Sequence, residues 1–257
     1  MPDTELLAAV REKRPLVHCI SNIVTANDCA NILYAAGASP MMAEAAEEMA
    51  EITALADSTV LNLGTPSANK YAAARVCVEE SVRLGKPFVL DPVGVGASKW
   101  RLGAFSALLF RGKPDMLRVN LSEAEAILGL GAREQGVDSL DQAFHGSRRD
   151  TAAALAEKLG TTVLLTGKVD VVAGGGRTET VEGGSDLMPL ITGSGCMLSA
   201  LCGAFAAVTG DMFAAALAAS RFWKRCSERA EAMCSGRGPG SLRAALMDAA
   251  WAMSREC

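Results

Sequence analysis

The feature that most constrains the fold of this chain is the alternation of short apolar runs with longer, Ala-rich amphipathic segments. The runs that indicate strands are residues 16–20, 60–63, 88–91, 116–120 and 163–166. Continuous apolar strands such as Phe88-Val89-Leu90 are typical of parallel sheets that are covered by helices on both faces. The pattern therefore predicts a three-layer α/β/α fold with a mostly parallel central sheet.

The remaining segments predict a hairpin and a helical C-terminal part. Residues 169–182 alternate like two antiparallel strands, and Gly174-Gly175-Gly176 is expected to be their turn because no helix follows it. From Cys196 to Cys257 the chain is expected to be almost entirely helical, with Ser241 capping the last helix. No linker, repeat or low-complexity tract divides the sequence. We therefore expect a single domain over residues 1–257.

Charge and hydropathy argue against several classes of function. The 25 Lys and Arg residues against 29 Asp and Glu give a net charge of -4, which favours neither nucleic acid nor anionic lipid as a partner. The longest near-apolar stretch, Cys196 to Val208, is shorter than the ~20 residues that a membrane-spanning helix needs. The N-terminal residues are acidic where a secretory signal is basic. These features predict a cytoplasmic protein that acts on small molecules.

The cysteines and histidines do not predict a zinc site. The 8 cysteines form no Cys-x-x-Cys pair, and the chain has only 2 histidines. Most of the cysteines are expected to be small core residues. Cys196 differs because it lies where the start of a helix could lower the pKa of a thiol. His18 lies inside an apolar strand, and a buried core histidine is the favoured interpretation.

Residues 191–200, Ile-Thr-Gly-Ser-Gly-Cys-Met-Leu-Ser-Ala, place two glycines around a hydroxyl residue just before a buried helix that is expected to begin at Cys196. Gly193 and Gly195 have no Cβ atom, so a ligand can approach their backbone. The start of the helix adds unpaired N–H groups and the positive end of its dipole. The segment predicts a phosphate site, although a tight strand-to-helix turn would have a similar sequence.

Polar residues close the predicted parallel strands. These residues are Asn62, Asp91, Asn120 and Thr166. In parallel sheets, ligands bind at the carboxyl ends of the strands. Pro92 and the glycines that follow turn the chain directly after Asp91, so this carboxylate is placed to hold a metal.

The segment after the 116–120 strand adds further candidates. Arg118 could pair with phosphate, and Ser122 is expected to cap a helix with Glu123 in its first turn. Glu123 either binds Mg²⁺ through water or only stabilises the helix start. Together, these groups indicate magnesium-dependent phosphoryl transfer. No phosphate-loop motif is present, since Gly167-Lys168 is followed by Val169, and protein-kinase signatures are absent.

Five motifs occur in the same order as in hydroxyethylthiazole kinases, a family of the ribokinase-like superfamily. They are Val17–Asn22, Asn27–Asn31, Gly37–Ala43, Asp91–Ala97 and Gly193–Cys196. The chain resembles this family from Pro15 to about Asp248. Most ribokinase-like enzymes have Asp at the fourth position of a Gly-x-Gly-Asp motif, whereas the thiazole kinases have Cys, as here at Cys196. The resemblance implies a ribokinase-like fold without a separate lid domain.

The resemblance also implies an activity, the phosphorylation by ATP and Mg²⁺ of the primary hydroxyl of 4-methyl-5-(2-hydroxyethyl)thiazole in thiamine biosynthesis or salvage. It implies that Met42, Gly193 and Asn22 contact the thiazole. Arg118 and Thr166 would contact ATP. Family members are trimers with sites at subunit interfaces, so a homotrimer is expected here.

The same resemblance assigns the charged and thiol groups. Asp91 and Glu123 would serve Mg²⁺. The backbone N–H groups of Gly193, Ser194, Gly195 and Cys196 would receive the charge that develops on the transferred phosphoryl group. Cys196 is the candidate catalytic residue, although phosphoryl transfer gains more from positioning and electrostatics than from a base.

Other functions remain open from the sequence. One alternative is another ribokinase-like activity, a pyrimidine kinase or a nucleotide-hydrate dehydratase, but these would be expected to have Asp at position 196. A second alternative is a thiazole- or nucleotide-binding protein that has lost catalysis. A third is a purely structural α/β protein, which would not need acids and glycines at its strand ends.

Overall fold

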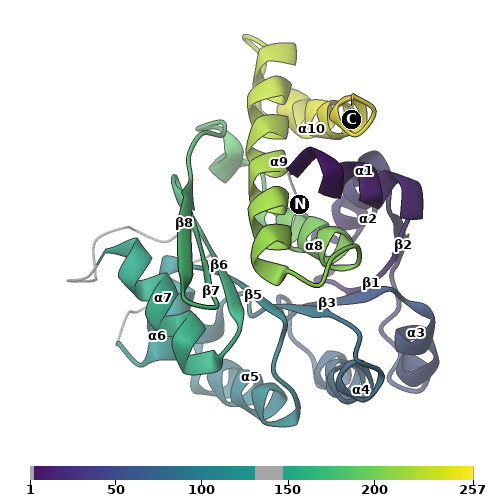
Figure 1. The fold of residues 1–257 in the computed structure, drawn as a ribbon, viewed down its shortest axis with the longest axis vertical. Coiled ribbons are helices and arrows are strands. Elements are labelled where there is room, and N and C mark those ends of the chain that lie inside the picture. Colours follow the sequence, from purple (N-terminus) through teal and green to yellow (C-terminus); the bar gives the residue numbers. More distant parts are fainter. Residues whose placement is uncertain (1–2, 131–146, 257) are drawn as a thin grey trace.

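The computed structural model of the protein describes residues 3–130 and 147–256. Within them, eight strands form one sheet in the order β2-β1-β3-β4-β5-β6-β7-β8 (Figure 1). The strands are β1 (Leu16–Ile20), β2 (Ser39–Met41), β3 (Ser58–Asn62), β4 (Phe88–Asp91), β5 (Met116–Asn120), β6 (Thr162–Thr166), β7 (Asp170–Gly174) and β8 (Arg177–Val181). Neighbours from β2 to β6 are parallel, and β7 and β8 pair antiparallel. The described residues contain no second sheet that would form a lid.

Helices cover both faces of the sheet (Figure 1). One layer contains α1 (Asp3–Lys13), α2 (Ala26–Ala36), α8 (Ser194–Ala206), α9 (Met212–Met233) and α10 (Pro239–Met253). The other layer contains α3 (Met49–Leu55), α4 (Ala68–Leu84), α5 (Lys99–Arg111), α6 (Leu121–Leu128) and α7 (Arg148–Leu159). Two single turns of 3₁₀ helix, η1 (Val95–Ala97) and η2 (Met188–Leu190), complete the described elements. The predicted three-layer α/β/α architecture is confirmed.

Side chains alternate between the two layers along each buried strand, as a pleated sheet requires. In β6, Leu164 packs with the α8 and α9 layer, and Val163 and Leu165 pack with the α6 and α7 layer. In β3, Val60 packs with the layer that contains α8 and α9, and Leu61 packs with the opposite layer. Burial on both sides explains why these strands are almost continuously apolar in the sequence.

Helix α8 lies unusually close to the sheet at Gly203. A Cβ atom at this position would be 2.9 Å from Cγ1 of Val17 and closer still to the side chain of Val60. The hydroxyl of Ser58 on β3 also donates a hydrogen bond to the carbonyl oxygen of Gly203, over 2.8 Å. The contact anchors the middle of α8 to β1 and β3.

The five predicted strands and the β7–β8 hairpin are confirmed, with Gly175 and Gly176 in the turn. Strand β2 was not expected, because its three residues include Pro40 and are too few to make an alternating pattern. A proline is tolerated there because β2 is at the edge of the sheet. No described helix combines the length and apolarity needed to span a membrane.

Two helix starts differ from the expected ones. Helix α8 begins at Ser194, two residues before Cys196, with Gly193 as its N-cap. Helix α10 begins at Pro239 after Gly238, so Ser241 lies inside the helix and does not cap it. Proline at the first helical position loses no hydrogen bond, which favours the earlier start.

Asn120, and not Ser122, caps helix α6. The side-chain oxygen of Asn120 accepts a hydrogen bond from the backbone N–H of Glu123, and Glu123 in return accepts one from the N–H of Asn120. This reciprocal pair is a capping box, in which the two residues are three positions apart. Ser122 directly precedes Glu123 and is two residues too close to form it. The expected place of Glu123 in the first turn is confirmed.

The expectations for the cysteines and for His18 are largely confirmed. Cys19, Cys29, Cys77, Cys202, Cys226 and Cys234 are buried, and Cys257 lies outside the described residues. His18 is fully buried, and its Nε2 lies 3.0 Å from the carbonyl oxygen of Ala43. Burial lowers the pKa of His18, so it is a neutral core residue.

Candidate functional site

The carboxyl ends of β1, β3, β4, β5 and β6 meet the start of α8 at one edge of the sheet. Asn62 and Asp91 are direct neighbours in the β3–β4 register, and Asn120 and Thr166 are neighbours in the β5–β6 register. All four side chains are buried, as is Asn22 after β1. The sequence prediction that the strand ends gather polar groups is therefore correct.

The two carboxylate oxygens of Asp91 have different environments. Oδ2 accepts hydrogen bonds from Nδ2 of Asn62, at 3.0 Å, and from the hydroxyl of Ser199, at 2.6 Å. Oδ1 is buried and has no hydrogen-bond partner among the described residues, although Nη1 of Arg118 lies 3.8 Å away. Burial raises the pKa of Asp91, and the charge of Arg118 offsets this only in part. One oxygen is held by the protein and the other remains for a ligand.

Glu123 is fully buried and held by two backbone groups. Its Oε1 accepts a hydrogen bond from the N–H of Gly94, over 2.9 Å, and its Oε2 accepts one from the N–H of Asn120, over 2.8 Å. Burial, followed by the negative charge of Asp91, raises the pKa of Glu123 to about 7. The charge of Asp91 therefore adds to burial in keeping Glu123 partly protonated near neutral pH.

Arg118 lies between this acidic pair and the end of β6. Its Nη2 donates a hydrogen bond to Oγ1 of Thr166, over 2.6 Å, so the structure brings these two predicted residues together. Burial alone would lower the pKa of Arg118, but the charges of Asp91 and Glu123 raise it above its ordinary value. A Cβ atom on Gly195 would be 2.7 Å from Cζ of Arg118, so the guanidinium lies against the first turn of α8.

Helix α8 starts without a side-chain cap. Gly193 has a φ of 86°, a left-handed conformation, and a Cβ atom there would be 2.9 Å from Cβ of Thr25. The N–H of Ser194 donates to the carbonyl of Ile191, over 3.2 Å. Within the described residues, the N–H groups of Gly195 and Cys196 have no hydrogen-bond acceptor. Free N–H groups at a helix start are suited to bind an anion.

Cys196 lies beside Asn22. Nδ2 of Asn22 donates hydrogen bonds to Sγ of Cys196, over 3.1 Å, and to Oδ1 of Asn62, over 3.2 Å. The expectation of a lowered pKa for this thiol is wrong. Burial and the charge of Asp91 raise the pKa of Cys196, and Arg118 offsets only part of this. The helix start is thus outweighed by desolvation, and the group is a neutral thiol at neutral pH.

Met42 is not part of this buried network. It directly follows β2, at the edge of the sheet and one strand away from the segment that carries Asn22, and it is 39% exposed. Ile23 and Val24, next to Asn22, are also exposed. The part of the network next to Asn22 therefore has an apolar, solvent-exposed border.

Residues 7–256 match the model of the hydroxyethylthiazole kinase family. The chain belongs to this family. A hydroxyethylthiazole kinase from Desulfitobacterium hafniense is 42% identical over 245 residues, which cover 95% of this chain and 91% of that protein. The solved structure of a hydroxyethylthiazole kinase from Pyrococcus horikoshii OT3 is 39% identical, has a TM-score of 0.86, and covers 97% of this chain and 92% of that chain.

The fold extends beyond the hydroxyethylthiazole kinase family. A ribokinase-like superfamily protein from Enterococcus faecalis is similar in structure, with a TM-score of 0.67, and the match covers 98% of this chain and 94% of that chain. Its sequence is only 12% identical, so this similarity concerns the fold alone. The ribokinase-like fold that the sequence predicted is confirmed.

Three further buried residues of this family member, Asn62, Ser199 and Lys70, lie in or beside this network. The sequence pattern predicts the place of Asn62 at a strand end but no role for any of the three. Ser199 follows Gly195 by four residues, a spacing that puts both on one face of α8. Lys70 is buried in the first turn of α4, and its Nζ donates to the carbonyl oxygens of Ser21, at 2.8 Å, and Gly64, at 3.0 Å. It joins the loops that follow β1 and β3.

The carboxylates fit a magnesium ion. In the described part of the chain, no three His, Cys, Asp or Glu side chains are grouped to hold a metal. Mg²⁺ does not need such a group, because it is usually bound by one or two carboxylates together with water and substrate phosphates. Oδ1 of Asp91 is buried without a hydrogen bond and is the natural oxygen ligand.

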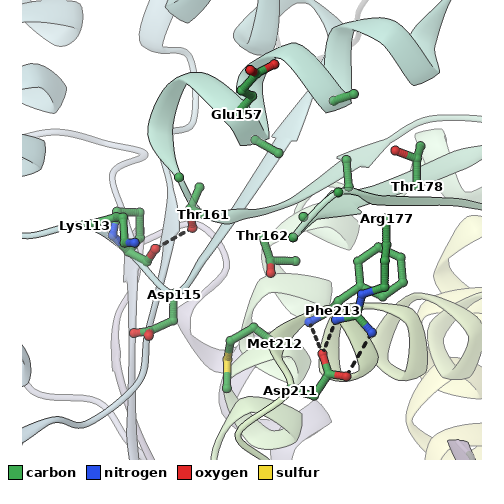
Figure 2. A pocket seen from close by; sticks show the side chains of 18 of the residues that line it. Lys113, Asp115, Glu157, Thr161, Thr162, Arg177, Thr178, Asp211, Met212 and Phe213 are labelled. Atoms are coloured by element: carbon green, nitrogen blue, oxygen red, sulfur yellow. Dashed lines mark hydrogen bonds and ion pairs between the residues drawn. The ribbon is translucent and has the colours of Figure 1, made fainter.

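A cavity of about 920 Å³ lies at the opposite edge of the sheet, where β5 and β6 begin (Figure 2). Its lining includes Lys113, Thr162, Arg177, Asp211 and Phe213. Figure 2 shows Arg177 directed at Asp211, with nitrogen–oxygen distances of 2.7 and 3.1 Å, and lying over the ring of Phe213. None of the predicted site residues lines this cavity.

Proposed function

We propose that the protein transfers the γ-phosphoryl group of ATP to the primary hydroxyl of 4-methyl-5-(2-hydroxyethyl)thiazole, with Mg²⁺, in thiamine biosynthesis or salvage. The observation that carries this proposal is the uncapped start of α8, whose free N–H groups lie beside the buried Arg118 and Asp91. Membership of the hydroxyethylthiazole kinase family and the full-length relatives support it.

The phosphoryl group is proposed to lie at the start of α8. The backbone N–H groups of Gly193, Ser194, Gly195 and Cys196 form this anion hole, of which those of Gly195 and Cys196 have no other acceptor among the described residues. Arg118 adds a positive charge that burial keeps close to the reacting atoms. Phosphoryl transfer gains most from such preorganised charge, because the enzyme makes no covalent bond to the group. Thr166 holds Nη2 of Arg118 and is proposed to face ATP with it.

Asp91 and Glu123 are proposed to hold Mg²⁺, which would neutralise charge on the phosphates of ATP. Asp91 would act through its unpaired Oδ1. Both oxygens of Glu123 already accept backbone hydrogen bonds, so its contact with the ion would be through water. The raised pKa values of both carboxyl groups are consistent with a site that is completed by a cation.

The acceptor alcohol is proposed to bind beside Cys196, with Asn22, Gly193 and Met42 around the thiazole ring. A base with a pKa above the working pH is mostly protonated and abstracts a proton inefficiently. The raised pKa of Cys196 therefore supports a contribution to catalysis that is smaller than the contribution of the fixed charges. Cys196 would contact the reacting hydroxyl and assist the loss of its proton.

The protein is proposed to be a homotrimer with its sites at subunit interfaces. The exposed Ile23 and Val24 beside Asn22, together with Met42, support burial of this border by a second subunit. Light scattering after size-exclusion chromatography tests this, and a monomer would contradict it. We further propose a single domain over residues 1–257, because every described strand belongs to one sheet. A cytoplasmic location remains a prediction from the sequence.

The test of the function is phosphoryl transfer from ATP to hydroxyethylthiazole with and without Mg²⁺, with the product identified by mass spectrometry. A hydroxymethylpyrimidine serves as the control acceptor. Magnesium-dependent thiazole phosphate with little pyrimidine product is the expected result. Preferred transfer to the pyrimidine would contradict the proposed substrate. Tight binding of the thiazole without any product would identify a binding protein.

A further inference from the structure

The orientation of the Asn62 carboxamide is fixed by its neighbours. Its Oδ1 lies 3.0 Å from the backbone N–H of Gly64, which can only donate a hydrogen bond. The oxygen must therefore point to Gly64, and Nδ2 must point to Oδ2 of Asp91, 3.0 Å away. The side chain is 2% exposed, so water does not compete for these contacts.

The same carboxamide reaches the other side of the site. Oδ1 of Asn62 also accepts a hydrogen bond from Nδ2 of Asn22, over 3.2 Å, and Asn22 donates to Sγ of Cys196. Within residues 3–130 and 147–256, no other side chain is hydrogen-bonded to both Asn22 and Asp91. Among the described residues, Asn62 is thus the one side chain whose hydrogen bonds connect Asn22, and through it the thiol of Cys196, with the carboxylate of Asp91.

We propose that Asn62 is a positioning residue that fixes the acceptor side of the site relative to the metal side. This role rests on the function proposed above, in which Asn22 contacts the alcohol and Asp91 serves Mg²⁺. Asn62 holds Asn22 in the direction of Cys196. It also occupies Oδ2 of Asp91 and leaves Oδ1 to face the nucleotide.

Ser199 provides a comparison inside the same site. Its hydroxyl donates to the same oxygen, Oδ2 of Asp91, over 2.6 Å, and it is equally buried. Its other contact is the carbonyl oxygen of Gly195 in its own helix, and it has no hydrogen bond to Asn22 or Cys196. Removal of this hydroxyl therefore loosens Asp91 alone, whereas removal of the Asn62 carboxamide loosens both sides.

The experiment compares Asn62→Ala, Ser199→Ala and the control Ser81→Ala with the unchanged protein. Ser81 is a buried serine in α4 whose hydroxyl has no hydrogen-bond partner among the described residues. Calorimetry measures the dissociation constants of hydroxyethylthiazole and of magnesium-ATP, each ligand alone. Circular dichroism and thermal unfolding verify that each variant is folded.

Asn62→Ala is expected to weaken both ligands about 5-fold, the factor that corresponds to the loss of about one hydrogen bond. Ser199→Ala is expected to weaken magnesium-ATP alone, and Ser81→Ala neither ligand. The positioning role is overturned if Asn62→Ala changes neither affinity more than Ser81→Ala does, or if it changes only one of them.

A second variant allows the test to proceed if Asn62→Ala does not fold. Asn62→Leu retains the volume of the side chain but has neither the oxygen for Gly64 and Asn22 nor the donor to Asp91, so it is expected to weaken both ligands as Asn62→Ala does. Loss of affinity for only one ligand, or for neither, would overturn the role. Because both readouts are binding constants, they remain decisive even if the unchanged protein transfers no phosphoryl group, a result that would refute the proposed function separately.

Discussion

At the carboxyl edge of the sheet, Asp91 and Arg118 face each other in a buried site, whereas at the amino edge Arg177 and Asp211 pair in front of an open cavity. The pKa of the aspartate shifts in opposite directions in these two Asp–Arg pairs. Hydrogen bonds from Arg177 lower the pKa of Asp211 to about 2, while burial raises the pKa of Asp91 despite the nearby Arg118. Desolvation explains the difference. Burial of the Asp91 carboxylate costs more hydration free energy than its attraction to Arg118, 3.8 Å away, recovers.

The cavity and the unsatisfied polar groups lie at opposite edges of the sheet. The cavity of about 920 Å³ is lined by an ion pair whose side chains are 53% and 44% exposed, so water already satisfies these charges. The carboxyl edge contains an unpaired carboxylate oxygen and uncapped N–H groups. Buried, incompletely satisfied polar groups are therefore the reason why we propose the carboxyl edge, and not the cavity, as the place of the reaction.

The strongest test is removal of one carboxylate at each edge. Asp91→Asn is expected to lower kcat/KM by about 10³-fold, the scale of preorganised charge in a water-excluded site. Asp211→Asn is the matched control and is expected to retain activity within about 2-fold, because exposed ion pairs contribute little. Steady-state kinetics on folded variants measures both. Similar losses of kcat/KM in Asp91→Asn and Asp211→Asn would contradict the proposal that the reaction takes place at the carboxyl edge.

Replacement of the thiol is expected to have a smaller effect. Cys196→Ala should lower kcat by less than about 100-fold, the lower end of what a positioned base contributes, because the raised pKa leaves little thiolate. Single-turnover kinetics measures the chemical step directly. Complete loss of transfer in a folded variant would show that proton abstraction outweighs the fixed charges of the site.

The pH dependence of stability should differ between the edges. The raised pKa of Glu123 means that its contribution to stability is fully present below its ordinary value of 4.5 and is lost as the pH rises through about 7. The lowered pKa of Asp211 acts in the opposite sense, with a contribution present above 3.8 and lost as the pH falls through about 2.

Thermal unfolding from about pH 5 to pH 8, without Mg²⁺ or nucleotide, measures the Glu123 contribution. Glu123→Gln is expected to flatten the decline in Tm over this range, even though its amide lowers stability overall by facing backbone N–H groups. Asp211→Asn should leave this part of the curve unchanged. An unchanged slope in Glu123→Gln would contradict the assignment of the raised pKa.

The smallest effect is expected for the ion pair at the cavity. Arg177→Ala should lower the free energy of unfolding only slightly, since the ion pair with Asp211 is exposed to water and the contact with Phe213 adds little. Denaturant unfolding measures this, and turnover of the thiazole should not change. A marked fall in turnover would connect the cavity to the reaction.

The sequence predicts the framework of the site well, because parallel strands buried on both faces have long apolar runs and end abruptly. The positions of Asn62, Asp91, Asn120 and Thr166 at strand ends follow from that pattern alone. The helix caps were harder, since Asn120-Leu121-Ser122-Glu123 offers two capping residues. The spacing of three between Asn120 and Glu123 was the signal that separates them.

Contacts between distant segments could not be predicted from local pattern. Asn22 and Asn62 are 40 residues apart, and their hydrogen bond depends on the order of the strands in the sheet. The pKa of Cys196 was misjudged for a similar reason. A helix start is visible in the sequence, but the burial of the thiol and the approach of Asp91 arise only from the packing of α8 over β4.

The contact at Gly203 implies that a substitution in the middle of α8 can change the activity of the site at the start of this helix. Gly203 is nine positions after Ser194 in α8, about 13.5 Å along the axis at 1.5 Å per residue. Protein engineers commonly replace a glycine inside a helix with alanine to gain up to about 1 kcal/mol. At this position the added methyl group would instead push the helix away from Val17 and Val60 and move its first turn, where we propose the anion hole. Directed-evolution libraries for this enzyme should therefore treat residue 203 as part of the active site.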